Sequence, residues 1–426
     1  MFFLFSKNIF YFFQFSLLTR HTVVGPTPPQ MPAVKAFPQD HHVRIRANEK
    51  VPIDLHVRTY GDPSHPAILA VAGFGANKEV GCENSFYKRL ADRNLFVVSF
   101  SNRDAGGSTK MSHLPTRSMT STLLLAALAG LLPPSVTTVV VLYCMRNYRS
   151  PMAQTVAGAV LALFTGFKAY GGTKAFHLKP AYTLEDVADD IPLLMNQMNI
   201  EKAHIMGTSM GGMLAQTAVL RHPERFLSLG SVMSNTGANS IIGLPDYPLS
   251  TLLYLYVVHP MSRPDPEDYD AMIKYESEGI KFQLQRAKDG TATFNEGLTV
   301  MQEAKRRYDA HTKYDTLQSR KDSMGRQMDG IAWQQGDRTA ELKKIQIPTV
   351  VVHGMEDKLI PATSGLETAS AIGLPACRRV VLVPECGHTY DDIFSIPCVD
   401  AIAENIHFAE DTMKSRSSGV LVRSKL

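Results

Sequence analysis

Short, uninterrupted apolar runs separated by helix-like segments are the feature of this 426-residue sequence that most limits its possible folds. AILAVAG at 67–73, LFVVSF at 95–100, AHIMG at 203–207 and TVVVHG at 349–354 are such runs, and each is too short for a typical helix. Runs of this kind are typical of strands buried on both faces of a parallel sheet. The sequences between them have helical spacing, so the order of elements predicts an α/β fold.

Other segments are assigned by the same rules. VRIRANEKVPIDLHVRTYG at 43–61 contains two alternating runs around a charged turn, which predicts an antiparallel hairpin. The segment 182–200 predicts a helix with Thr183 as its N-cap and Asp186 at the capping-box position. The remaining predicted elements are helices over 85–94, 210–223 and near 398–408, and strands within 226–235 and 378–388.

Composition excludes several classes of function. Apolar residues make up 44% and charged residues 20% of the chain, which is a globular composition. The net charge is only +4 and no basic stretch is interleaved with aromatic residues, so we expect no nucleic acid partner. The five cysteines form no CxxC pair and have no histidine at metal-ligand spacing, which predicts free thiols in a reducing compartment and no metal site. No glycine pattern matches a phosphate-binding loop, so no nucleotide cofactor is predicted.

A serine between glycines follows one of the buried runs. The sequence from Gly207 through Thr208, Ser209 and Met210 to Gly211 fits G-x-S-x-G, the motif in which a tight strand-to-helix turn exposes a serine hydroxyl. Side chains at positions 207 and 211 would collide across that turn. The helix that begins at Met210 directs its free N–H groups toward any negative charge that forms there. The competing interpretation is that Ser209 is simply a small residue in a tight turn.

Two further side chains have the character that an activated serine requires. A serine hydroxyl needs a base to take its proton, and that base needs a partner to hold its tautomer. Asp357 follows the run TVVVHG, and His388 follows the next apolar run. The order serine, aspartate, histidine is the one expected of this kind of sheet. The neighbouring Glu356 is the alternative acid, and we expect Asp391 and Asp392, as a pair, to be surface charges.

These features together resemble the α/β-hydrolase superfamily, and more closely its esterases similar to aclacinomycin methylesterase. The resemblance covers most of 43–111 and 181–408 and depends on GTSMGG, HGMEDKLIP and ECGH. It implies an α/β-hydrolase fold with a mostly parallel central sheet. It also implies that Ser209 is the nucleophile, Asp357 the orienting acid and His388 the general base.

The resemblance further implies an oxyanion hole made of two backbone N–H groups. One belongs to Met210, directly after the serine, and the other to Phe74 in the sequence VAGFG. Many members of the family have His-Gly at this turn, whereas this chain has Ala72 and Gly73, so any role of that histidine is lost. In the stretch that resembles D-x-R-D-x-G-x-S, Ser101 replaces the first aspartate.

An apolar insertion at 112–175 is expected after the fourth strand. It contains STLLLAALAGLLPPSVTTVVVLYCM and PMAQTVAGAVLALFTGFKAY, which are long and apolar enough to cross a bilayer. Two crossings would return the chain to the side from which it came. A membrane hairpin, an apolar cap and translated intron sequence remain the three interpretations.

The hydrolase domain is expected over 37–408, with a tail at 409–426. The stretch 236–335 lacks a strand pattern and is expected to form a helical lid. Residues 1–36 begin with a phenylalanine-rich segment that fits a targeting signal, a short anchor or a mis-assigned start.

The expected function is that of a serine ester hydrolase that forms an acyl-enzyme and needs no cofactor. A small-molecule or lipid ester is the expected substrate, and a monoacylglycerol or lysophospholipid is preferred if the hairpin forms. The protein would then be membrane-associated, and otherwise cytoplasmic. An aminopeptidase of the same fold and a non-catalytic membrane scaffold are the alternatives.

Overall fold

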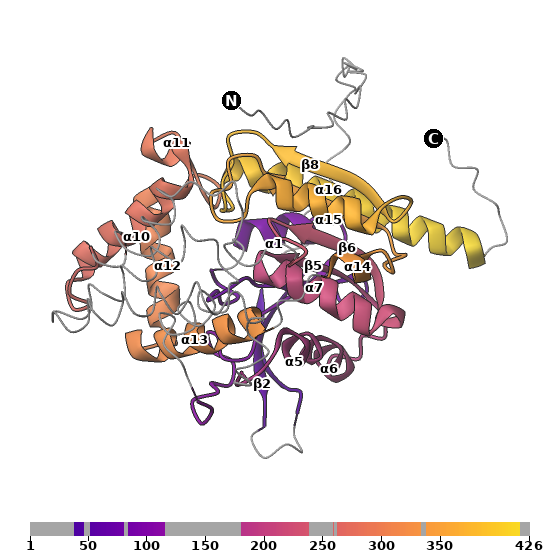
Figure 1. The fold of residues 1–426 in the computed structure, drawn as a ribbon, viewed down its shortest axis with the longest axis horizontal. Helices are drawn as coiled ribbons and strands as arrows, with labels where there is room; N and C mark the ends of the chain where they lie inside the picture. The colour runs from indigo at the N-terminus through magenta and orange to yellow at the C-terminus, as the bar shows by residue number, and fades with distance from the viewer. Residues whose placement is uncertain are drawn as a thin grey trace, which may run out of the picture. The chain divides into compact units, whose positions relative to one another are not determined.

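The computed structural model describes residues 38–46, 52–80, 84–115, 180–237, 259, 262–333 and 338–417, and all structural statements below concern these residues. Eight strands form one sheet in the order β1-β2-β4-β3-β5-β6-β7-β8 (Figure 1). The first two strands are antiparallel to their neighbours, and the other six run parallel to one another. The predicted mostly parallel α/β sheet is therefore confirmed.

Most strands lie where the apolar runs predict them, but β1 begins four residues before the predicted hairpin. β1 (Gln39–Arg44) and β2 (Asp54–Tyr60) form the predicted antiparallel hairpin, with Val43 opposite Leu55. Every residue of the two central strands that precede the candidate serine and acid is buried. The six parallel strands are β3 (Ala67–Val71), β4 (Phe96–Phe100), β5 (Ala203–Thr208), β6 (Phe226–Val232), β7 (Thr349–Gly354) and β8 (Cys377–Val383).

Two apolar cores lie on opposite faces of the sheet, because successive residues of a strand point to opposite faces. In β3, Leu69 and Val71 enter the first core, whereas Ile68 and Ala70 enter the second. The helices that cover the first core include α5 (Leu184–Ala188), α6 (Asp190–Gln197), α7 (Met210–Arg221), α14 (Thr339–Leu342) and α15 (Ala362–Ile372). The second core lies against α1 (Asn84–Ala91) and α16 (Asp392–Ser417).

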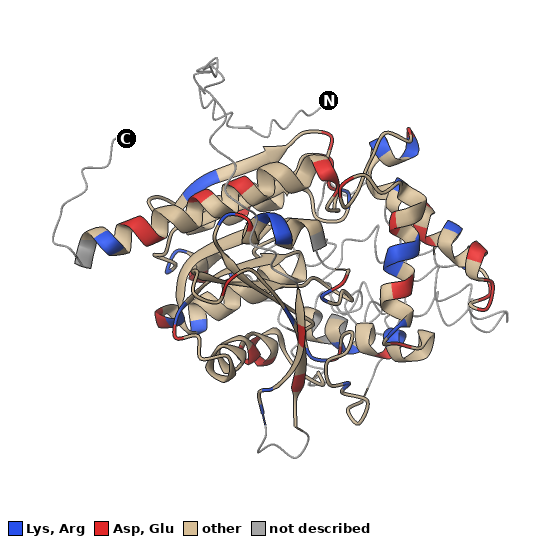
Figure 2. Cartoon of the chain, turned by 180° about the vertical axis from the view of Figure 1, so that it is seen from behind, with Lys and Arg blue, Asp and Glu red and all other residues tan. Residues whose placement is uncertain are grey.

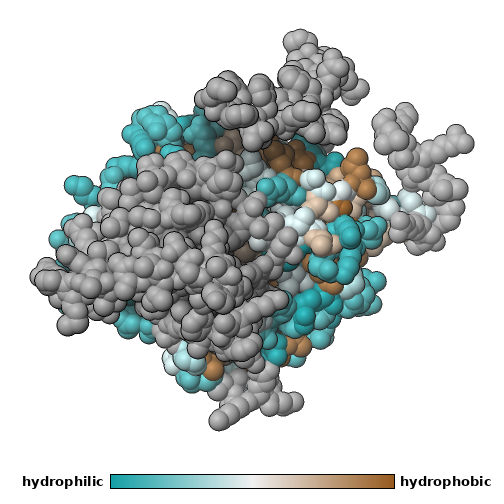
Figure 3. All heavy atoms as spheres, in the orientation of Figure 1, coloured by the Kyte–Doolittle hydropathy of each residue, from teal (hydrophilic) through white to brown (hydrophobic). Residues whose placement is uncertain are grey.

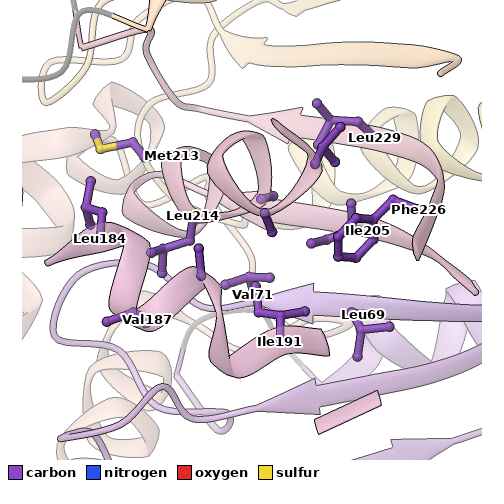
Figure 4. Close-up of a cluster of buried hydrophobic side chains, with 14 of the residues drawn as sticks. Leu69, Val71, Leu184, Val187, Ile191, Ile205, Met213, Leu214, Phe226 and Leu229 are labelled. Carbon is purple, nitrogen blue, oxygen red and sulfur yellow. The ribbon is translucent and has the colours of Figure 1, made fainter. Parts of the chain in front are cut away.

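The first core supports the helix that follows the candidate serine. Figure 4 shows Leu214 of α7 between Val71 of the sheet and Val187 of α5. All three side chains are buried. Burying a large aliphatic side chain contributes about 1.5–3 kcal/mol relative to leaving it exposed. The start of α7 is therefore fixed by packing and not by its own propensity, since its first three residues include two glycines.

The described part of the predicted lid, 262–333, is helical, as expected. Four helices form it: α10 (Tyr269–Gln283), α11 (Gln285–Lys288), α12 (Val300–Thr312) and α13 (Leu317–Trp333). α10 and α12 pack side by side around a small core of their own (Figure 1). Charged residues are spaced along these helices, whereas the central strands carry few (Figure 2).

Two helix predictions require correction. The predicted N-cap and capping box at Thr183 and Asp186 are confirmed, but the helix over 182–200 is broken at Asp189 into α5 and α6. Pro192 explains the break, because it has no N–H to donate to the carbonyl four residues earlier. The final helix, expected near 398–408, starts earlier and ends later, as α16 shows.

Three of the five cysteines lie in the described residues, which test only the prediction that their thiols are free. Cys377, Cys386 and Cys398 are free and buried.

The predicted strand and helix boundaries otherwise hold to within a few residues.

Several predicted segments fall outside the described residues. These are 1–36, the apolar insertion 112–175 from residue 116 onward, most of 236–261, and the tail after residue 417. Among the described helices, none combines the length and the apolar character needed to span a bilayer. On the face drawn in Figure 3, the described surface is mostly hydrophilic, with small separate hydrophobic areas.

Candidate active site

The turn between β5 and α7 holds Ser209 in a strained backbone conformation. Its φ of 57° and ψ of −123° are rare for a residue with a side chain. A Cβ added to Gly207 would lie 2.0 Å from the carbonyl oxygen of Gly211, so the predicted collision across the turn is correct for this glycine. At Gly211 the obstacle is different, because an added Cβ would lie 2.1 Å from the carbonyl oxygen of Val71 in β3.

Asp357 and His388 meet at the same edge of the sheet. They follow β7 and β8, which are adjacent parallel strands, and Nδ1 of His388 lies 2.6 Å from Oδ2 of Asp357. The carboxyl ends of parallel strands share one edge, and β5 places Ser209 at that edge as well. The alternative acid, Glu356, is exposed. The structure thus pairs His388 with Asp357, as predicted.

The carboxylate of Asp357 is buried, and both of its oxygens have hydrogen-bond or ion-pair partners. Its Oδ1 accepts hydrogen bonds of 2.8 Å from the backbone N–H groups of Leu359 and Ile360. Burial alone would raise the pKa of Asp357, but the charge of His388 and hydrogen bonds from His353 and His388 hold it well below its usual range. Asp357 is therefore ionised at neutral pH. An ionised partner at Nδ1 keeps the proton there and leaves Nε2 of the imidazole available as a base.

One hydrogen bond ties the serine turn to the histidine loop. The hydroxyl groups of Thr208 and Tyr390 lie 2.6 Å apart and are buried. These residues are the immediate neighbour of Ser209 and the second residue after His388. Among the described residues, Ser209 Oγ makes no hydrogen bond to His388. In enzymes without substrate such catalytic bonds are often long and tighten only in the complex.

The turn after β3 lies directly against the serine. A Cβ added to Gly73 would be 3.3 Å from Cβ and 3.9 Å from Oγ of Ser209. In the described part of the chain, the backbone N–H groups of Phe74 and Met210 donate no hydrogen bond. Both predicted oxyanion donors therefore adjoin the serine turn, and no described residue accepts a hydrogen bond from either.

The loop after β4 makes hydrogen bonds to this turn and to the residues that follow it. Nδ2 of Asn102 donates to the carbonyl of Ala72 at 3.0 Å. Ser101, which replaces the family's aspartate, is buried and accepts a 3.0 Å hydrogen bond from the backbone N–H of Lys78. The hydroxyl of Ser101 and the side-chain amide of Asn102 thus connect this loop to the segment 72–78.

A comparison with known families identifies the class of protein. A family model described as alpha/beta hydrolase fold matches residues 66–390. This chain belongs to the α/β hydrolase fold family.

Curated relatives and solved structures agree with this assignment. The chain is 27% identical over 199 residues to a 2-hydroxy-6-oxo-6-phenylhexa-2,4-dienoate hydrolase of Comamonas testosteroni, a match that covers 46% of this chain and 59% of that protein. The match thus spans about three fifths of the length of this relative and of the next one found, and less of others. A solved enzyme of the same name from Rhodococcus sp. strain RHA1 has a TM-score of 0.50 and 18% identity, with 89% of this chain and 98% of that chain covered. The likeness to that structure concerns the fold alone.

The prediction that Asp391 is a surface charge is wrong. In this α/β hydrolase its side chain is fully buried, three residues after His388, and accepts a 2.8 Å hydrogen bond from the backbone N–H of Phe394 at the start of α16. Arg286 of α11 forms an ion pair with the same carboxylate. Burial raises the pKa of Asp391. Asp392 is partly exposed and accepts from backbone N–H groups in the loop before α12.

His353 is a site residue that sequence reasoning missed. It is the first residue of the HGxxD stretch, its side chain is buried, and Nε2 lies 2.8 Å from the carbonyl oxygen of Ile360 and 3.3 Å from Oδ2 of Asp357. The imidazole of His353 therefore links the end of β7 to the loop that carries Asp357. Its only signal in the sequence is its place in the stretch HGMED, directly before the loop that carries Asp357.

The described residues contain no cluster of three or more side chains able to hold a metal ion. The expectation that no metal or cofactor is needed stays a prediction.

Proposed function

We propose that this protein is a serine hydrolase that cleaves carboxylic esters through an acyl-enzyme formed on Ser209. The observation that carries the proposal is the 2.6 Å contact between His388 and the ionised, buried Asp357 at the sheet edge that bears the strained serine. An orienting acid at Nδ1 is what converts an imidazole into a base for a serine hydroxyl.

In the proposed reaction, Nε2 of His388 takes the proton of Ser209 as Oγ attacks the ester carbonyl. The oxygen that becomes negative is stabilised by the N–H groups of Phe74 and Met210 and by the start of α7. The carbon–oxygen bond breaks, and His388 gives its proton to the leaving alcohol. Water then repeats the sequence: it loses a proton to His388, attacks the acyl carbon, and releases the acid as Ser209 regains the proton.

Acid-quenched turnover of p-nitrophenyl butyrate tests the proposal. Because the nucleophile is a side chain, we expect a butyryl group on the peptide that contains Ser209 and an early release of about one nitrophenolate per chain. Hydrolysis without any acyl-serine, or with the acyl group on another residue, would contradict it.

The class of ester is a further part of the proposal. The helices α10 to α13 would form the lid over the site, and the apolar segments at 121–145 and 151–170 favour a lipid ester. The aminopeptidase and scaffold alternatives have less support. A non-catalytic scaffold would not require an ionised acid in contact with Nδ1 of His388.

A specific observation favours a second candidate, the hydrolysis of a substrate that carries a carboxylate. Arg320, Met324 and Gln327 lie on one face of α13, because residues four and seven positions apart face the same side. Met324 and Gln327 both contact the turn at Gly75. Nε of Arg320 is buried and has no hydrogen-bond partner among the described residues, and the carboxylates of Glu276 and Asp315 act on its charge without a direct bond to Nε.

A buried, unpartnered donor costs free energy, which an anionic part of a substrate would recover. The dienoates in the names of the matched relatives are carboxylates. A carboxylate-bearing ester or dienoate is therefore the second candidate substrate.

A pair of esters separates the two candidates. We expect Arg320→Gln to lower kcat/KM for p-nitrophenyl hemisuccinate by about tenfold, the loss of one charged hydrogen bond, and to leave p-nitrophenyl butyrate unchanged. Lys321→Gln, a change of a neighbouring exposed cation, is the matched control and should affect neither. An equal effect of Arg320→Gln on both esters would remove the carboxylate candidate.

A further inference from the structure

The turn that carries Phe74 receives a hydrogen bond from a distant helix. The backbone N–H of Gly75 donates to Oε1 of Gln327 in α13 at 2.9 Å, across 252 residues of sequence. Gln327 is buried, and Gly75 has a left-handed φ of 63°. Within the turn itself, the N–H of Ala76 donates to the carbonyl of Gly73 at 3.3 Å. The hydrogen bond to Gln327 thus holds the peptide group between Phe74 and Gly75 from a separate element of the fold.

A side-chain contact accompanies the hydrogen bond. A Cβ added to Gly75 would lie 3.3 Å from Cγ of Met324, one helical turn before Gln327. α13 therefore touches the turn at two points on one face. A shift of the helix would move the turn, and with it the N–H of Phe74.

A buried ion pair fixes the position of α13. Nε and Nη2 of Arg326 donate to the two carboxylate oxygens of Asp104 at 2.5 and 2.9 Å, and both side chains are nearly inaccessible. Oγ of Ser323 and the hydroxyl of Tyr182 also donate to Asp104, at 3.1 and 3.0 Å. Removing one partner of a buried pair costs about 3–5 kcal/mol. The helix is therefore held firmly against the loop that follows β4.

We infer that Gln327 is a positioning residue of the oxyanion hole: it holds the Phe74–Gly75 peptide so that the N–H of Phe74 faces the oxygen of the tetrahedral intermediate. This inference depends on the proposed serine hydrolase function. Because the oxyanion exists only during the reaction, Gln327 contributes to kcat and not to the binding of the ester.

Gln327→Met tests the inference, since methionine has a similar length and lacks the carboxamide oxygen. Deleting an oxyanion donor costs about 10²–10³ in kcat, so misorienting one should cost about tenfold or more with KM nearly unchanged. A boronic acid, which forms a tetrahedral adduct with the serine, should lose affinity by the same factor. Gln318→Met on the exposed part of the same helix is the matched control, and it should change neither quantity.

A second variant separates the hydrogen bond from packing. Gln327→Ala removes the same acceptor but leaves a different packing defect, so we expect the same loss of kcat in both variants. Hydrogen exchange of the Gly75 amide should be faster in both than in the wild type. Equal kcat in wild type and both variants would overturn the inference while leaving the proposed function intact. A wild type that neither hydrolyses esters nor reacts with a fluorophosphonate would instead remove the proposed function, and this inference with it.

Discussion

Replacing Ser209 with alanine should lower kcat/KM for ester hydrolysis by about 10⁶-fold, the loss found when a triad serine is removed from a serine protease. The reason is chemical, because alanine has no atom that can attack the carbonyl. The fold should survive the change. Ser209 is the N-cap of α7 but its side chain makes no capping hydrogen bond, so the hydroxyl adds nothing to the stability of that helix.

Hydrolysis of p-nitrophenyl butyrate and thermal unfolding measure these two effects separately. Ser99→Ala is the matched control, because it removes a hydroxyl that is buried in the same sheet and has no hydrogen-bond partner among the described residues. The control should retain full activity. Activity of the Ser209 variant within tenfold of the wild type would mean that another group is the nucleophile.

Asp357→Asn is expected to have the second largest effect, a loss of about 10⁴-fold in kcat with the fold retained. Oδ1 of Asp357 accepts from two backbone N–H groups, at Leu359 and Ile360. An asparagine must keep its carbonyl oxygen in that position, so its NH₂ group faces Nδ1 of His388. A donor at that position favours the wrong tautomer and places the proton on Nε2, where the base is needed.

Glu356→Gln is the control for this variant. The adjacent side chain is exposed, and its replacement should leave kcat unchanged. Measuring kcat for a neutral ester from pH 5 to 9 in both variants decides between the two acids. A greater loss in Glu356→Gln than in Asp357→Asn would assign the acid to Glu356.

Sequence patterns were sufficient to predict the central strands, because a strand that is buried on both faces appears in the sequence as a continuous apolar run. The apolar runs at β3, β5 and β7 needed no information from elsewhere in the chain to be recognised as strands. The cap at Thr183 is local in the same sense, since its partner is three residues away. Ser209 and Asp357 could be placed because they directly follow β5 and β7, and His388 because it follows the next predicted strand, β8.

Long-range polar contacts could not be predicted in this way. Asp391 has the appearance of a surface charge in sequence, and only the packing of Arg286 from a separate helix reveals why its burial is tolerated. The bond between Thr208 and Tyr390 joins residues 182 positions apart, and that between Gly75 and Gln327 joins residues still further apart. Such contacts depend on tertiary packing, for which a single sequence has no periodic signal.

The most direct test of the central claim is the reaction of the full chain with an alkyl fluorophosphonate, followed by mapping of the modified peptide. A serine activated by His388 should react with one equivalent of reagent, at Ser209 alone, and Asp357→Asn should react far more slowly. Modification at another residue, or no modification of a folded protein that still hydrolyses esters, would contradict this account.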